Sequence, residues 1–217
     1  MIIRATAFTA AVAAGGVVLY RSLLRGPVLT WGATPDEAAR ELPGDELLEE
    51  ADIVSTRAIA IDAPPAAVWP WLVQMGPGRA GAYTYDWIEN LLGLDMHSAD
   101  TVVPELQHLE VGEVIRGTGG GGTGMRVELL EPERVLATRS EDGRWVWSFV
   151  LVEEDGITRL ISRNRISTGG LSQGGRIGMA VMEPGSLVME RKMLFGIKER
   201  AERLAREESE QLVFAAR

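Results

Sequence analysis

The stretch from Met125 to Ile166 carries the strongest β-sheet signal in the chain, and its last turn fixes how two strands pair. Asp155-Gly156 separates two runs rich in apolar and β-branched residues, and Asp-Gly is a typical two-residue hairpin turn. With this turn, Val152 lies opposite Arg159, and every other pair of the hairpin follows from it. Residues that oppose one another directly lie on the same face of a sheet.

The pairing therefore predicts two faces of different character. One face carries Val146, Val150, Val152, Arg159, Arg163 and Arg165. The other carries Trp145, Trp147, Phe149, Leu151, Leu160, Ser162, Asn164 and Ile166. We expect the arginine-bearing face to meet solvent and the tryptophan-bearing face to be concave and to pack on a helix. A register slip of one residue would exchange the two faces.

Residues 63–90 are rich in aromatic side chains and follow a strand-like run, Ser55–Asp62. Pro64-Pro65 ends that strand and suits the first turn of a helix, because proline has no N–H to leave unpaired there. We expect a short or kinked helix that ends at Gly76, and a second short helix, Trp87–Leu92, with Asp86 as its N-cap.

The longest predicted helix opens at Glu183-Pro184. Its apolar stripe at helical spacing consists of Leu187, Leu194, Ile197, Ala201 and Leu204. Met189 and Met193 add apolar bulk beside this stripe, and Glu190-Arg191-Lys192 is assigned to the solvent side. We expect residues 209–217 to fray. The glycine-rich segments 117–124 and 168–178 are predicted loops, the second being either a plain connector or a lid.

The first 26 residues are predicted to form a hydrophobic helix that anchors the chain. Ala5–Tyr20 is a run of 16 residues without a charge, slightly shorter than the roughly 17–25 residues of a spanning helix. Leu23 and Leu24 extend it. An uncleaved anchor in the bacterial cytoplasmic membrane is favoured over a cleaved signal peptide or a soluble helix, and the side on which the domain lies stays open. Residues 27–52 are predicted to be an acidic, solvated linker, with an interaction arm as the alternative.

Composition excludes several kinds of site. The chain has no cysteine, which excludes disulfides and thiolate metal sites. Its net charge of −9 argues against nucleic acid as a partner. The two histidines, His97 and His108, show no metal-ligand spacing. We therefore expect neither a metal nor a cofactor.

Four blocks of sequence resemble one family. They are Trp31–Thr34 (WGAT), Leu42–Asp45 (LPGD), the aromatic stretch 63–90 and Met189–Glu202. These blocks are similar to a bacterial branch of the SRPBCC superfamily, the START-like and birch-pollen-allergen-like group that includes polyketide cyclase/dehydrase-type proteins. The resemblance implies an α+β helix-grip domain over residues 53–208. In this fold a curved antiparallel sheet wraps around a long C-terminal helix and leaves a cavity between them.

Such a cavity would hold a hydrophobic small molecule. The predicted ligand-binding residues are Trp71, Tyr83, Tyr85, Trp87, Trp145, Trp147, Phe149, Asn164, Met193 and Ile197. Asp86 and His97 are weak candidates for acid–base chemistry. The favoured function is a membrane-tethered carrier of a lipid-like or polyketide-like molecule. The alternatives are a cyclase/dehydratase-type enzyme, which should place a histidine or a carboxylate pair in the cavity, and a structural or interaction protein.

Overall fold

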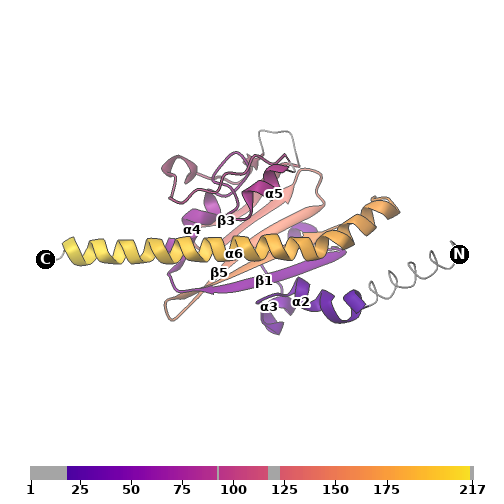
Figure 1. Cartoon of the computed structure of the whole chain (residues 1–217), viewed down its shortest axis with the longest axis horizontal. Coiled ribbons are helices and arrows are strands. Elements are labelled where there is room, and N and C mark those ends of the chain that lie inside the picture. Colours follow the sequence, from indigo (N-terminus) through magenta and orange to yellow (C-terminus); the bar gives the residue numbers. More distant parts are fainter. Residues whose placement is uncertain (1–18, 92, 117–122, 216–217) are drawn as a thin grey trace, which may run out of the picture.

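The computed structural model describes residues 19–91, 93–116 and 123–215 (Figure 1). Six antiparallel strands form one sheet in the order β1-β6-β5-β4-β3-β2. The strands are β1 (Ile53–Ile61), β2 (Val114–Ile115), β3 (Met125–Glu131), β4 (Val135–Ser140), β5 (Trp145–Glu154) and β6 (Ile157–Ile166). The long C-terminal helix, α6 (Gln173–Ala215), lies across one side of this sheet. The predicted α+β helix-grip arrangement is therefore confirmed.

Shorter helical elements surround this frame. They are η1 (Tyr20–Leu24), α2 (Arg25–Leu29), α3 (Pro35–Ala39), η2 (Asp45–Leu48), α4 (Pro65–Val73), α5 (Asp86–Leu91) and η3 (Pro104–Leu106). Helix α4 begins with proline and contains a second one, Pro70. Asp86 does not serve as the expected N-cap. Its carboxylate instead accepts hydrogen bonds from the Ser98 backbone N–H and hydroxyl, at 2.8 and 2.6 Å, and so ties α5 to the following loop.

The hairpin register is the predicted one. Val152 pairs with Arg159 and Val146 with Arg165 across β5 and β6. On the face that meets α6, which we call the helix face, Phe149 packs into one core cluster with Met193 of α6. The other face, the strap face, bears the arginines, as the register required.

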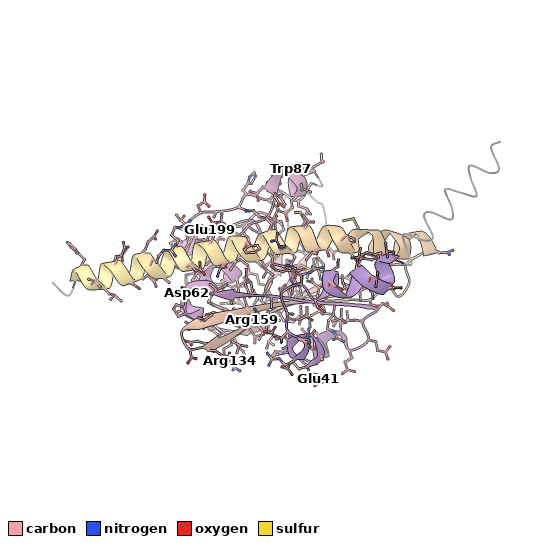
Figure 2. The ribbon with its side chains drawn as sticks, turned by 60° about the horizontal axis from the view of Figure 1, so that its bottom comes forward. Glu41, Asp62, Trp87, Arg134, Arg159 and Glu199 are labelled. Atoms are coloured by element: carbon pink, nitrogen blue, oxygen red, sulfur yellow. The ribbon has the colours of Figure 1, made fainter. Side chains whose placement is uncertain are left out.

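The strap face is nevertheless not exposed to solvent, so this part of the prediction is wrong. Arg163 retains only 2% of its accessible surface, because residues 35–49 lie over it. We call this segment the acidic strap. Figure 2 shows Glu41, within the strap, below the sheet and α6 above it. The sequence interpretation of residues 27–52 as a solvated linker therefore does not hold for the strap.

Polar and apolar contacts both hold the acidic strap. Glu37 meets Arg159 with oxygen–nitrogen distances of 2.7 and 2.8 Å, and Asp45 meets Arg163 at 2.6 Å. The Arg163 guanidinium also donates to the Glu37 and Arg40 carbonyls. A small second core lies beneath, made of Leu42, Ala58, Val135, Val150 and Ile161.

Helix α6 is longer than predicted at both ends. It begins at Gln173 rather than Glu183 and continues through Ala215. Pro184 thus lies inside it, and the N-terminal part of α6 bends away from the axis of the rest (Figure 1), as expected where proline removes a helical hydrogen bond. The C-terminal turns extend past the sheet with Leu212 and Phe214 exposed.

Within the described ranges, no helix combines the length and the apolar character needed to cross a membrane. Of the predicted anchor, residues 1–26, only the part from Leu19 onward belongs to those ranges.

Candidate functional site

A cavity of about 240 Å³ lies between the helix face of the sheet and the N-terminal half of α6. Strands β1, β5 and β6 form its floor, α6 forms its roof, and α2 contributes Leu29 at one side. Its lining is mostly apolar: Leu29, Ile53, Trp145, Trp147, Ile166, Met179, Met182 and Met189, with Ser55, Arg57, Asn164, Glu183, Ser186 and Glu190 as polar members.

Two indole rings form the floor. Trp145 and Trp147 alternate onto the same face of β5 and stack at 5.6 Å between centroids with planes 20° apart. Each indole N–H already donates, from Trp145 to the Asn164 side-chain oxygen at 2.7 Å and from Trp147 to the Ser162 hydroxyl at 2.9 Å. Since their polar edges are satisfied, the rings offer the cavity an apolar, polarisable surface.

The opposite wall is rich in methionine. Met179 and Met182 lie about one turn apart on α6, and Met189 lies about two turns further along. Met182 keeps 59% of its surface accessible. Methionine side chains are unbranched and flexible, so this wall can adjust to ligands of different shape.

A buried ion pair borders the cavity where β1 faces α6. The Arg57 and Glu190 side chains, exposed by 1% and 7%, form a direct salt bridge. Ser162 donates to Glu190 Oε1 at 2.7 Å, and the Asn164 amide nitrogen lies 3.3 Å from Oε2. Burial raises the pKa of the Glu190 carboxyl, while Arg57 and Ser162 oppose this shift by favouring the carboxylate.

A second carboxylate lies at the side of the cavity nearest to α2. Glu183 directly precedes Pro184 in α6. Its carboxylate forms a salt bridge with Arg25 at 2.8 Å and accepts a hydrogen bond from the Tyr20 hydroxyl at 3.0 Å. These contacts fasten the N-terminal elements η1 and α2 to α6.

The predicted ligand-binding residues fall into three groups. Trp145, Trp147 and Asn164 line the cavity. Phe149, Met193 and Ile197 are buried in the main core, as are Trp71 and Tyr83, whose rings meet edge to face at 5.9 Å. Tyr85 and Trp87 lie on the surface, 37% and 70% exposed, and Figure 2 shows Trp87 at the far edge of the molecule.

The weak acid–base candidates lie elsewhere. The His97 side chain is 77% exposed and contacts Asp95 at 3.2 Å, and Asp86 is occupied by Ser98. Neither lines the cavity. Among the described residues, no three histidine, aspartate or glutamate side chains gather as a metal site would require.

The charged residues that line the cavity were not predicted from the sequence. Glu190 was assigned to the solvent side of the helix, yet it is buried. Its burial could have been predicted from helical spacing. The apolar stripe lacks a residue in the turn between Leu187 and Leu194, and residue 190 lies in that turn on the same side of the helix. Arg57 likewise is the one charge inside the run Ser55–Ile61. A lone charge on each of two apposed apolar surfaces indicates a buried pair.

Several solved structures are similar to this chain. No family profile and no curated protein matches the chain. A Polyketide_cyc-like protein from Corynebacterium glutamicum is 18% identical, with 73% of this chain and 93% of that chain covered and a TM-score of 0.37. The Aha1 dimer from Colwellia psychrerythraea shows 17% identity, coverage of 69% and 96%, and a TM-score of 0.41. Similarity at this level carries no information on what the chain binds.

Proposed function

We propose that this domain binds one small, largely apolar molecule in the cavity between the sheet and α6. The observation that carries the proposal is the lining itself. Stacked indoles on one side and flexible methionines on the other surround a space with few polar groups, which is the usual composition of a small-molecule site. A filled core would leave no such space next to Trp145 and Trp147.

The volume limits the ligand. About 240 Å³ is slightly below the range of roughly 300–1,000 Å³ that drug-sized ligands occupy. A single ring system or a short alkyl chain fits without rearrangement, and a larger lipid-like or polyketide-like molecule requires the methionine wall to move.

We further propose that residues 1–26 tether the domain to the cytoplasmic membrane. The support is the uncharged run Ala5–Tyr20 between Arg4 and Arg21, together with Leu19, Leu23 and Leu24, each more than half exposed. A carrier held at the membrane would lie close to a source of apolar ligands. Full-length chain should stay with membranes through a carbonate wash; uncleaved chain in the soluble fraction would contradict the tether.

A second candidate is an enzyme of the cyclase or dehydratase type. The observation in its favour is that two carboxylates, Glu183 and Glu190, line the cavity. Both are held in salt bridges, Glu183 by Arg25 and Glu190 by Arg57, and protonating either carboxylate would break its pairing with arginine. For this reason binding without turnover is the function that we favour.

The binding test compares two tryptophan substitutions on α6. Met189→Trp places an indole in the cavity, whereas Val188→Trp adds the same side chain at a position that is 54% exposed. Full-length wild-type chain and both variants are titrated, in one detergent, with prodan, an uncharged dye whose emission depends on polarity. We expect saturable binding by the wild type and Val188→Trp and its loss in Met189→Trp. Equal signals from all three would overturn the proposal.

A further inference from the structure

Arg57 and Glu190 form an ion pair without net charge, and the hydrogen bonds of Arg57 are more completely satisfied than those of Glu190. The Arg57 guanidinium has three kinds of partner: its Nε donates to the Val28 carbonyl at 3.2 Å, one terminal nitrogen binds Glu190, and the other donates to the Ser186 hydroxyl at 3.0 Å. Every nitrogen of the guanidinium is therefore engaged within the protein.

Glu190 is held less firmly by Asn164 than by its other partners. Its described neighbours, Arg57, Ser162 and Asn164, are all donors, which is the environment of an ionised carboxylate, since that group only accepts hydrogen bonds. The Asn164 contacts, at 3.3 and 3.4 Å, are long. Together with the bonds from Arg57 and Ser162, they account for the roughly four acceptor sites of a carboxylate, so a ligand donor can take the place of a long Asn164 contact.

We propose that the cavity selects uncharged apolar molecules, in particular those that carry a hydroxyl group, over the corresponding carboxylates, and that Glu190 sets this selectivity. The inference rests on the proposed binding function and names the chemical class of its ligand. Glu190 acts here by its charge and its acceptor oxygens.

The physical reason is the balance of charge at the cavity wall. Arg57 would attract a ligand carboxylate, but Glu190 already neutralises it and holds its terminal nitrogen. A second carboxylate would leave one buried negative charge without a counter-charge, and burying an unpaired charge is strongly unfavourable. A hydroxyl brings no charge and can donate to Glu190 while its alkyl chain lies along Trp145 and Trp147.

The test uses n-octanol and octanoate, which differ mainly in the charged group. Binding to full-length chain is measured by calorimetry at about pH 8, where the octanoate carboxyl is ionised, and the heat seen with Met189→Trp is subtracted as non-cavity binding. Any apolar cavity favours the alcohol to some degree, so the decisive quantity is the ratio of the two dissociation constants in each variant.

Glu190→Gln keeps the size and an acceptor oxygen but leaves Arg57 uncompensated. We expect it to improve octanoate binding and weaken octanol binding, so that the ratio shifts toward octanoate by about tenfold or more. Glu199→Gln removes the same charge from the exposed side of α6 (Figure 2) and should leave the ratio unchanged. Arg57→Gln/Glu190→Gln, which removes both charges, should abolish the gain in octanoate binding.

Two results would overturn the inference while leaving the binding function intact: equal octanol and octanoate affinity in the wild type, or an unchanged ratio in Glu190→Gln. The first of these needs no variant to fold. Absence of saturable cavity binding for both octanol and prodan in the wild type would instead overturn the proposed function, and this inference with it.

Discussion

Both faces of the sheet carry buried arginine–carboxylate pairs, but the surroundings of these pairs differ. On each face, arginines from the strands pair with acids from the element that covers them: Arg57 with Glu190 of α6 on the helix face, and Arg163 with Asp45 on the strap face. The strap-face pairs lie over a small apolar core. The helix-face pair lies beside a cavity.

The difference lies in what else the guanidinium binds. Arg163 donates to the carbonyls of Glu37 and Arg40, which belong to the acidic strap itself. These hydrogen bonds exist only while the strap is docked, whereas the bond from Arg163 Nε to the Thr56 hydroxyl, at 2.9 Å, stays within the sheet. Arg57 binds two side chains of α6 and one carbonyl before β1. An ion pair that fastens the acidic strap is a structural contact, whereas under the proposed binding function the pair that borders the aromatic cavity can also contact a ligand.

The strongest test of this comparison removes the acid of the helix-face pair. Glu190→Ala leaves the Arg57 guanidinium buried without its counter-charge, and breaking a buried pair in this way costs about 3–5 kcal/mol. Glu199→Ala, on the exposed side of the same helix, should change the free energy of unfolding by no more than about 0.5 kcal/mol. Urea unfolding measures both, and similar values for the two variants would mean that the pair is not buried in solution.

Arg163→Ala is the corresponding test of the strap face. Removing a solvent-facing arginine would hardly change stability. Removing the buried Arg163 takes away the main partner of Asp45 and its hydrogen bonds to three strap carbonyls. We expect a loss of about 2–4 kcal/mol in the free energy of unfolding, with faster proteolysis between residues 35 and 49.

Arg134→Ala is the matched control, because the Arg134 side chain is 73% exposed beside Glu131. Its removal should fall within about 0.5 kcal/mol of the wild type. If Arg163→Ala behaves like this control, the acidic strap is not docked as described.

The two faces also differ in how much of their structure can be predicted from the sequence. The Asp155-Gly156 turn sets the register locally, so the separation of arginines from tryptophans follows from alternation alone. The cover of the strap face does not follow in this way. It depends on a contact between Glu37 and Arg159, which are far apart in the chain, and eight acids in residues 36–52 are equally typical of a solvated segment.

The cavity was predictable in part for a similar reason. Alternation placed Trp145, Trp147 and Asn164 on the correct face, but a list of aromatic residues cannot separate a cavity wall from a filled core, and Trp71 and Phe149 belong to the core. Glu190 was missed because charge was given more weight than helical phase. The start of α6 was missed because Pro184 was taken as a first-turn residue, although an interior proline is tolerated where the helix bends.

Trp147→Ala tests the cavity side at a smaller cost in stability. The ring is partly exposed to the cavity and contacts Trp145 and Phe149 at centroid distances of 5.6 and 4.9 Å. We expect a loss of about 2–3 kcal/mol, below or at the low end of the range for a fully buried tryptophan, with prodan binding weakened severalfold. Val150→Ala, on the strap face of the same strand, should leave prodan binding unchanged; a loss there as well would place the dye elsewhere.

The smallest expected effect is a difference in how the two faces respond to pH. The Arg159 hydrogen bonds hold the pKa of Glu37 below its ordinary value of 4.5, so the Glu37 contribution to stability is present above pH 4.5 and is lost as the pH falls through the folded-state value. Burial raises the pKa of Glu190, and the sign is opposite: ionisation of Glu190 costs stability as the pH rises from its unfolded-state value toward its folded-state value. Unfolding free energies measured from about pH 3 to pH 7 should therefore show a Glu37→Gln deficit, of about 1 kcal/mol or less, that disappears at the acid end. Glu190→Gln should change in the opposite direction: its stability relative to the wild type should be lowest at that acid end, where the native carboxyl is protonated, and should rise as the pH rises. If the two variants change in the same direction relative to the wild type, or if the Glu37→Gln deficit persists to pH 3, the two carboxylates do not differ in environment as the two faces require.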